Sequence, residues 1–582
     1  MRIKHFFGLA VIAAMTASCS SNNDLTNGGG NGSGENETGA SYASFSINLP
    51  TTRGTRADNP EFKPGETNEY DVFNATLLVF KEPTTATSEG EYTFVESVNL
   101  GSMEPWKNPN ETGVTTQAKI TAKLKNVDKN DNYFALVLLN NGSDTDPKVK
   151  LPTDVTTTYS AWNKADNATD KFDKTDKGFY MANAPLFKNN SVTTLVAIDK
   201  NKIFSTEAQA SSGEAAADIY VERGLAKVTL TDDTKAEKTV GTSSSYAGDK
   251  VTISKWALDV TNKKTFPIHN VDGLSTDYPN IWKNDATATA APSTQRFVDN
   301  SEAIAKRVYW GTDPNYKETN LSAETTESKN ARIENFNYVE KGDLTADPKD
   351  PQYCLENTFN LANMVQGQTT RVVFKGTYTP KSITPDANGT FYKIGKNVAL
   401  WNSEDLKKHI LAAVTKVVAD ASAAGASTTI TLNGSDNDLT TAGNHMLKAS
   451  NITVTKATGD VVTLQTEDVD AVNEKLGLSE GYGISTYEKG ESYYIARIKH
   501  FGDVLTPWNS GDAYKDNNLK YLGRYGMLRN NWYELNVQSV SGPGYPDVPE
   551  VKPNTPDDED DKYIKVSVKI LDWAKRSQSV DL

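Results

Sequence analysis

Cysteine is almost absent from this chain, and this excludes a fold held together by disulfides. The sequence has 2 cysteines among 582 residues. Cys19 ends an N-terminal segment that looks like an export signal, so Cys354 has no cysteine partner in the remainder of the chain. Small secreted domains without a large core usually depend on such cross-links. This chain must therefore be stabilised by ordinary hydrophobic cores.

Histidine is also scarce, and the sequence has no pattern typical of a catalytic or metal site. None of the 5 histidines stands at metal-ligand spacing from another histidine or from Cys354. A glycine-rich phosphate loop and a nucleophile elbow are missing as well. The acidic run Asp557 to Asp561 lacks the spaced oxygen ligands and the turn glycine of a calcium loop. We therefore expect no enzyme activity, no cofactor and no bound metal.

Clustered positive charge and long apolar runs are missing from the body of the chain. The formal net charge is -14, which argues against a nucleic-acid partner because the phosphate backbone attracts clustered Lys and Arg. Beyond the N-terminus, no segment is apolar and long enough to cross a bilayer as a helix. More than 550 residues remain there, enough for at least two domains.

The N-terminus has the layout of a lipoprotein signal. Arg2 and Lys4 precede the apolar run Phe6 to Met15, and small residues then lead to Cys19. Thr16 stands where such signals more often have Leu. We expect residues 1–18 to be removed and Cys19 to be acylated, which makes the exported protein a membrane-anchored lipoprotein.

A short apolar segment and two arginines follow a polar tether. Residues 20–40 are rich in Gly, Ser and Asn and bury nothing. The next residues alternate with a period of two, as in a half-buried strand with an inner face formed by Ala43, Phe45, Ile47 and Leu49. Arg53 and Arg56 then lie among small polar residues, where proteases cut most readily. An ordinary surface turn is the alternative reading of that segment.

Two series of strands predict a mainly β protein. The first is Tyr70–Phe80, Tyr92–Leu100, Thr115–Lys125 and Asn132–Asn141, and the second begins at Ala217–Leu230 and includes Tyr493–Phe501 and Asn531–Val540. Turn residues separate these runs, which favours antiparallel sandwiches. We predict one domain over 57–215 and another over 216–541, with polar loops around 270–350.

One helix is prominent in the second domain. It begins at Ser403 as the N-cap, has Glu404 and Asp405 in its first turn, and is expected to end at Gly425. Its apolar face is formed by Leu406, Ile410, Val414, Val417 and Ala421.

The C-terminal residues 542–582 read as a flexible arm that ends in a strand. Residues 542–561 are Pro-rich and then acidic, so we expect them to be extended and unpacked. The strand pattern that follows has one apolar face, formed by Ile564, Val566, Val568 and Ile570.

The first and last strands look interchangeable. If the first strand lies in a groove, the last strand of another molecule is able to occupy that groove by β-strand addition. Burial of four such residues contributes on the order of 6 to 12 kcal/mol. The resident strand is tethered and therefore wins until the tether is cut at Arg53 or Arg56. Such a head-to-tail contact does not close on itself and yields a filament.

These segments resemble a known family, the fimbrillins, which are subunits of the type V pili of Bacteroidales. The likeness is greatest to the major shaft subunits of the short (minor) fimbria. It rests on the signal with its arginine segment, on "YFALVLLNN" and "YVERGLAKV", and above all on "YGMLRNNWYELNVQSVSGPG" with the terminal "YIKVSVKILDWAKRSQSVDL".

The resemblance implies two transthyretin-like antiparallel β-sandwich domains and polymerisation by donor-strand exchange. An arginine-specific protease would remove residues 19–56 as a propeptide, cutting at Arg56, which Asp58 and Pro60 follow, or at Arg53. The donor strand would be Tyr563 to Trp573. Implied partners are identical subunits, anchor and tip subunits, the protease, and host or bacterial surface ligands. Adhesion and biofilm formation at a cell-surface fimbrium would be the role.

Two alternatives stay open at this stage. A surface glycan-binding lipoprotein would also be rich in β-structure and aromatic residues, and the chain has 9 Trp and 25 Tyr. It would keep its lipid and would have no use for a detachable tail. A tip or anchor subunit of the same fimbria is the other alternative, but a tip should lack the donor strand and an anchor should lack the cut.

Overall fold

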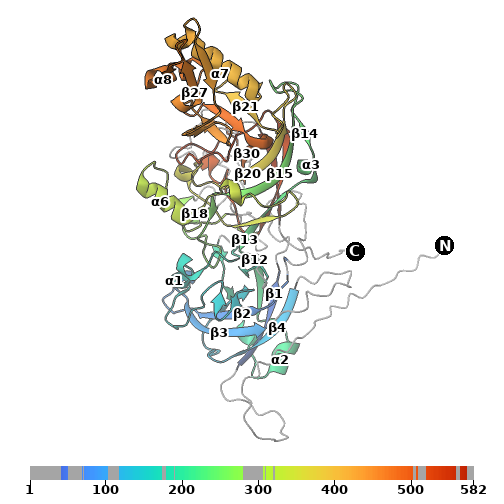
Figure 1. Cartoon of the computed structure of the whole chain (residues 1–582). Coiled ribbons are helices and arrows are strands. Elements are labelled where there is room, and N and C mark those ends of the chain that lie inside the picture. The colour runs from blue at the N-terminus through green and yellow to red at the C-terminus, as the bar shows by residue number, and fades with distance from the viewer. Residues whose placement is uncertain are drawn as a thin grey trace, which may run out of the picture.

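The protein is mainly β, with several sheets and a smaller share of helix, as Figure 1 shows for the whole chain. In this computed structural model the described residues are 41–49, 69, 71–101, 117–172, 178–188, 191–278, 306–308, 310–318, 321–501, 506–508, 519–558 and 564–572. The mainly β fold class predicted from the sequence is confirmed.

The first half of the chain forms an eight-stranded sheet, in the order β3-β2-β5-β8-β12-β1-β4 with β11 attached to β5. Its strands are β1 (Ser41–Asn48), β2 (Ala75–Lys81), β3 (Thr93–Gly101), β4 (Gln117–Leu124), β5 (Tyr133–Leu139), β8 (Met181–Asn183), β11 (Val196–Ala197) and β12 (Ala217–Arg223). Side chains of β1, β2, β4, β5 and β12 meet in one core. The sheet must therefore curve around that core, which a flat sheet would not enclose.

The predicted strand Ala217–Leu230 is divided into two strands that belong to different sheets. Strand β12 joins the first sheet, whereas β13 (Leu225–Leu230) pairs with β19 and β31. Gly224 lies between them, and a Cβ there would stand 2.4 Å from Cδ2 of Phe172. The crossing from one sheet to the next thus depends on a residue without a side chain. The domain boundary near residue 215 stays a prediction.

The second half contains two four-stranded sheets, β19-β13-β31-β32 and β14-β15-β20-β30. Both contribute apolar residues to one core, for example Val228, Trp256, Phe374 and Leu535. The alternation seen in the sequence explains this packing, because every second residue of a strand points to the same face. Their strands are β14 (Lys238–Thr239), β15 (Lys250–Asp259), β19 (Gln352–Leu355), β20 (Arg371–Thr379), β30 (Glu491–Arg497), β31 (Asn531–Val540) and β32 (Ile564–Asp572).

The prominent helix is α7 (Ser403–Val417), and both of its ends differ from the prediction. Asn402 is the N-cap, because its side chain accepts a hydrogen bond from the backbone N–H of Asp405. The helix ends at Val417 rather than near Gly425, and a short 3-10 turn over Ala419–Ser422 follows. Its apolar face packs in a separate core with α8 (Thr466–Lys475) and strands β21 (Phe391–Ile394), β23 (Ser427–Ile430), β27 (Ile452–Thr455) and β29 (Ile484–Tyr487).

The polar region around 270–350 is not made of loops alone, so that expectation was incomplete. It contains α4 (Leu274–Asp277), α6 (Thr326–Asn335) and β18 (Phe336–Asn337), which pairs with β16 (Thr261–Asn262). The Thr325 side chain caps α6 by accepting from the Ser328 N–H. The other short helices are α1 (Tyr159–Trp162), α2 (Glu207–Ser212) and α3 (Asp232–Lys235).

The remaining short strands form small ribbons or lie at sheet margins. They are β6 (Gly142–Ser143), β7 (Asp146–Pro147), β9 (Leu186–Lys188), β10 (Ser191–Thr193), β17 (Lys306–Arg307), β22 (Leu400–Trp401), β24 (Asn433–Gly434), β25 (Asn437–Asp438), β26 (Gly443–His445) and β28 (Val461–Val462).

The prediction that residues 542–561 are unpacked is wrong for the described part, which ends at 558. Asp557 is fully buried and accepts a hydrogen bond from Thr369 Oγ1 at 2.5 Å. Arg524 donates two hydrogen bonds to the Asp558 carboxylate, from Nε to Oδ2 and from Nη2 to Oδ1, each at 2.8 Å. Asp558 is thus neutralised by a buried arginine through a strong bidentate pair, and Arg497 Nε lies 3.6 Å from Asp557 Oδ1.

Candidate functional site: the first strand, its groove and the C-terminal strand

Strand β1 lies inside the first sheet, with a neighbour on each side. It pairs antiparallel with β4 and parallel with β12. Figure 1 shows β1 and β4 side by side at the lower right of the molecule. Its inner face is the predicted one: Ala43, Phe45 and Ile47 are 0% exposed, and Leu49 is 1% exposed. We call the space between β4 and β12, which β1 fills, the groove.

The outer face of β1 is covered as well, which corrects the expectation of a half-buried strand. Ser44, Ser46 and Asn48 are all buried. Helix α2 lies over this face, and Ser44 Oγ donates to the backbone oxygen of Ala210 in α2 at 2.6 Å. Small polar residues suit this position because they fit beneath a helix and keep their hydrogen bonds.

The segment around α2 is also joined to β1 by backbone hydrogen bonds. Tyr42 and Phe204 exchange two of them, at 2.7 and 2.8 Å. The N–H of Ala216 donates to the Ser44 oxygen at 2.6 Å. From β4, Lys119 Nζ donates to the Ser211 backbone oxygen at 2.8 Å and also to the Gly213 oxygen. Residues 204–216 therefore form a cover segment that holds β1 in the groove.

Polar side chains of both neighbouring strands line the outer side of the groove. The Cα partners of Ser46 are Lys119 on β4 and Asp218 on β12. Asp218 Oδ1 accepts from Asn48 Nδ2 at 2.5 Å, and Gln117 Nε2 donates to Ser46 Oγ at 2.5 Å. A strand in this groove thus runs beside Lys119 on one side and Asp218 on the other, and the Asp218 carboxylate bonds to a side chain of β1.

Glu69 fixes the chain where it enters the folded body after the arginine segment. Its side chain is 0% exposed and its Oε1 lies 2.6 Å from Lys227 Nζ on β13. Tyr353 Oη donates to the same oxygen at 2.6 Å, and Arg223 Nε donates to the Glu69 backbone oxygen at 3.0 Å. A cut at Arg53 or Arg56 would therefore leave this anchor in place.

The C-terminal strand β32 is the last strand of its sheet and pairs antiparallel with β31. It thus has a backbone neighbour on one side among the described residues. Val566 is half-buried against the core of the paired sheets. Ile564, Val568 and Ile570 lie on the same strand, so the predicted strand is confirmed as a strand.

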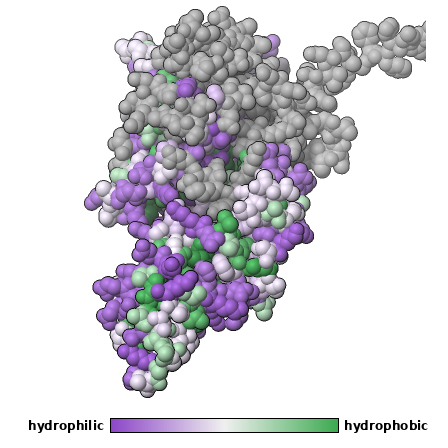
Figure 2. Space-filling view, turned by 90° about the horizontal axis from the view of Figure 1, so that it is seen from above, coloured by the Kyte–Doolittle hydropathy of each residue, from purple (hydrophilic) through white to green (hydrophobic). Residues whose placement is uncertain are grey.

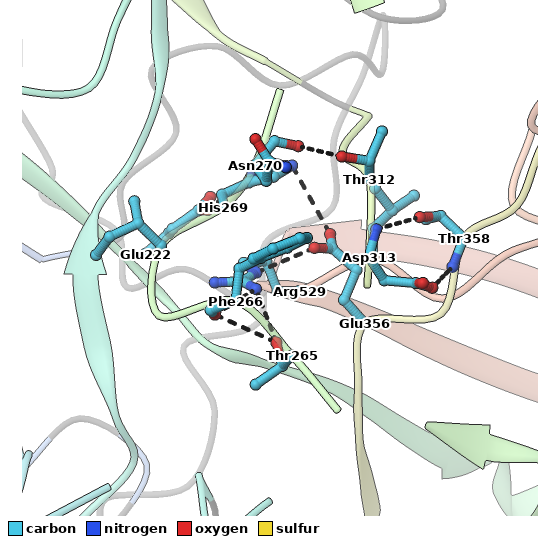
Figure 3. Close-up of polar contacts among 12 residues, drawn as sticks. Glu222, Thr265, Phe266, His269, Asn270, Thr312, Asp313, Glu356, Thr358 and Arg529 are labelled. Atoms are coloured by element: carbon cyan, nitrogen blue, oxygen red, sulfur yellow. Dashed lines mark hydrogen bonds and ion pairs between the residues drawn. The ribbon is translucent and has the colours of Figure 1, made fainter. Parts of the chain in front are cut away.

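A buried polar cluster connects the first sheet to the second half of the chain (Figure 3). Glu222 on β12 lies 2.8 Å from His269 Nδ1, and His269 Nε2 lies 3.7 Å from Glu356 Oε1. Arg529, just before β31, is 3.2 Å from Glu356. Gly311 leaves room for the ring, since a Cβ there would stand 2.1 Å from His269 Nε2. Glu356 is thus buried beside the opposite charge of Arg529, which is the condition for burying an ionisable group.

Some predicted site residues lie outside the described residues, namely Cys19, Arg53, Arg56 and Trp573. Lipidation and cleavage at these positions stay predictions. Sequence reasoning missed the cover segment and the residues Lys119, Asp218 and Glu69. The signal for α2 was present as Thr206, which accepts from the Gln209 N–H as an N-cap, but a helix this short has little periodicity.

Within the described ranges, no three His, Cys, Asp or Glu side chains are grouped as metal ligands would be. A helix long and apolar enough to span a bilayer is not found among them either. Burial raises the pKa of the Cys354 thiol to about 12. This suppresses the reactive thiolate form.

Comparison with known proteins places the likeness at the C-terminal end. Residues 485–579 match the family model of the C-terminal region of fimbrillin, the major fimbrial subunit protein type IV. No curated protein matches the chain. A fimbrial assembly protein from Parabacteroides distasonis ATCC 8503, known from a crystal structure, is 12% identical, with 47% of this chain and 78% of that chain covered. Its TM-score of 0.22 is too low to support an argument.

The matched residues include β30, β31 and β32, the strands that hold the C-terminal end of the chain. They contain the motif from Tyr525 to Gly544 and all but the last three residues of the terminal motif on which the resemblance rested. The resemblance of this chain to the fimbrillins is thereby confirmed, and it supports a fimbrial subunit at the cell surface.

Proposed function

We propose that this protein is a structural shaft subunit of a cell-surface fimbria that polymerises by donor-strand exchange. In this proposal an arginine-specific protease cuts at Arg56 or Arg53, β1 leaves the groove, and β32 of the next subunit enters it. The subunit would consist of two transthyretin-like β-sandwich domains. The polymer would serve adhesion and biofilm formation, together with anchor and tip subunits.

The position of β1 is the observation that carries the proposal. Loss of an edge strand would expose one row of backbone groups, whereas loss of β1 leaves unpaired groups on both β4 and β12. It also uncovers the apolar floor that Phe45 and Ile47 fill. Unpaired edges of this kind attract another strand. The emptied groove would therefore be a strong and specific receptor for an alternating apolar strand.

The position of β32 fits a strand that leaves its own subunit. Its ladder with β31 is given up on departure, and a ladder on each side is gained in the groove of a neighbour. Each backbone hydrogen bond contributes about 0.5–1.5 kcal/mol net. Exchange thus favours the polymer once the groove is empty.

Acylation at Cys19 would hold the precursor at the outer membrane until the same cut releases it. This step accounts for a lipoprotein signal on a subunit that ends in a surface polymer. Cleavage then has two consequences, because it opens the groove and detaches the lipid.

The glycan-binding alternative gains little from the described surface. Among the described large hydrophobic residues, the exposed aromatic ones are Phe73 and Tyr482, at 40% and 42%. Trp162, Trp256 and Trp310 lie in cores instead. Figure 2 shows hydrophobic residues only in small groups among hydrophilic ones over the described part of that face. A flat aromatic platform for sugars is therefore not favoured by the described residues.

The test is cleavage of the purified protein by an arginine-specific protease, followed by SDS gel electrophoresis without boiling. We expect ladders of oligomers from the full chain and none after deletion of Lys562–Leu582. A shorter deletion, of Gln578–Leu582, keeps the donor strand and should leave the ladders intact. Ladders that persist without Lys562–Leu582 would contradict the proposal.

A further inference from the structure

We propose that the donor strand enters the groove in one register, in which Ser567 takes the position of Ser46, with Lys119 and Asp218 as the residues that select it. This inference rests on the proposed donor-strand exchange and adds its geometry. The outer face and the inner face of the groove select the same register independently.

The outer face selects by charge. Three donor residues would face outward, Lys565, Ser567 and Lys569. The position of Ser46 lies directly opposite Lys119 on β4, and like charges directly opposite each other destabilise a strand pair. Ser567 is the one outward residue of these three without a positive charge, so it fits opposite Lys119.

The same register gives one donor lysine a carboxylate. When Ser567 is at the position of Ser46, a lysine is at the position of Asn48, where Asp218 Oδ1 now accepts from Asn48 Nδ2. Asp218 is otherwise exposed to solvent on this face. The ammonium of the donor thus replaces a neutral amide beside an existing carboxylate.

The inner face selects by burial. In this register Ile564, Val566, Val568 and Ile570 fill all four positions of Ala43, Phe45, Ile47 and Leu49. A shift by two residues in one direction would bring Asp572 to one end of this row, and a shift in the other would bring Lys562 to an end. An unpaired buried charge is costly, and both shifts also place a lysine opposite Lys119.

The register does not depend on the direction in which the donor runs. Its outward residues are symmetric about Ser567, since Lys565 and Lys569 stand two residues before and after it. Reversal exchanges the two lysines and keeps the four apolar residues on the inner face. The remaining lysine comes to the position of Ser44, beneath the Ala210 oxygen, so the cover segment must move outward when the donor enters.

Cysteine pairs measure the register directly. Thr121 on β4 is the Cα partner of Ser44, and the only cysteine left after maturation, Cys354, is buried. Thr121→Cys is combined in turn with Lys565→Cys, Ser567→Cys and Lys569→Cys, and the cleaved full chain is oxidised. A disulfide needs Cα atoms closer than about 7 Å, and diagonal neighbours in a sheet lie about 7–8 Å apart.

We expect an intersubunit disulfide with Lys565→Cys or Lys569→Cys, and none with Ser567→Cys. A polymer that cross-links through Ser567→Cys would overturn the register, because it shows a shift by two residues. A polymer that cross-links through none of the three would overturn it as well. If the parent chain forms no polymer at all, the proposed function fails and the register fails with it.

A charge exchange tests the two selecting residues. Ser567→Lys should slow polymerisation about fivefold relative to the neutral variant Ser567→Gln, the upper range for directly opposed like charges. Lys119→Glu should restore the rate of Ser567→Lys, measured relative to Lys119→Glu alone. Lys125→Glu changes an exposed lysine just beyond β4 and should not restore it. Equal rates for Ser567→Lys and Ser567→Gln would overturn the role of Lys119.

Discussion

Glu69 and Lys227 form an ion pair of 2.6 Å in which both side chains are almost completely removed from solvent, with exposures of 0% and 1%. The ammonium also lies 3.8 Å above the ring of Trp532 on β31. Glu69 lies between β1 and β2 of the first sheet along the chain, whereas Lys227 belongs to β13 of the next sheet. The pair therefore ties the segment that leads into β2 to the junction between the sheets.

Removal of one partner of this pair should be costly. Lys227→Met leaves a buried carboxylate without its ammonium, and we expect the free energy of unfolding to fall by about 3 kcal/mol. The double variant Glu69→Gln/Lys227→Met should recover part of the loss. As a control, Lys235→Met breaks an exposed pair with Asp232. This substitution should change the free energy of unfolding by under about 1 kcal/mol. Urea unfolding followed by fluorescence measures all of these variants, and equal effects at the two sites would contradict the expectation.

Phe45 should stabilise the precursor and not the polymer. Phe45→Ala removes a fully buried ring of β1 and should destabilise the uncleaved chain by about 3–5 kcal/mol. After cleavage β1 is gone, so the heat resistance of the ladders should equal that of the parent. Leu77→Ala, in β2 of the same core, should weaken both. A polymer weakened by Phe45→Ala would mean that β1 stays in the groove.

Cleavage should depend on Arg56 more than on Arg53. We expect Arg56→Ala to abolish the mature N-terminus at Ala57, and Arg53→Ala to leave it unchanged. N-terminal sequencing or intact-mass measurement of the cleaved protein distinguishes the two. The reverse outcome would move the cut to Arg53 without affecting the exchange itself.

The cover segment should become more mobile when β1 leaves. Helix α2 is held by Ser44 and by the ladder of Tyr42 with Phe204, and both contacts disappear with β1. We expect amide hydrogen exchange in residues 207–212 to become at least tenfold faster after cleavage, before polymerisation. Helix α8 packs in a different core from β1, so its hydrogen exchange serves as the internal control. Unchanged protection of α2 would show that its stability does not come from β1.

Asp313 should make stability depend on pH. Burial raises the pKa of Asp313 to about 7, and the nearby Glu356 also raises it, against the lowering effect of the hydrogen bonds from Thr358, Asn315 and Asn262. Between its ordinary pKa and about 7, the folded state keeps a proton that the unfolded state has lost. The free energy of unfolding therefore falls as the pH rises through this window.

The substitution Asp313→Asn removes the titratable carboxyl group and keeps a polar side chain at this position. Between pH 5 and pH 7, we expect the free energy of unfolding of the parent to fall by on the order of 2 kcal/mol relative to that of this variant. Urea unfolding of both proteins at the two pH values measures the difference. A constant difference would show that Asp313 keeps its charge state in this range.

Local patterns in the sequence were enough to place most strands. The run Asn531–Val540 is a strand with these bounds, and the alternating residues from Ile564 onward form β32. Such patterns succeed because a period of two is a property of the chain itself. The N-terminal end of α7 was predicted wrongly for the opposite reason. Asn402 and Ser403 are both good N-caps, and only the fold decides which one is used.

What the sequence by itself determined is which face of β1 is apolar, because Ala43, Phe45, Ile47 and Leu49 repeat with the period of a strand. Only the tertiary structure decided that β1 lies between β4 and β12 and that its polar face is buried beneath α2. It also decided that Asp557 and Asp558 pack against arginines far away in the sequence. The physical reason is that periodicity arises from neighbouring residues, whereas burial and charge pairing depend on segments that the chain brings together only when it folds.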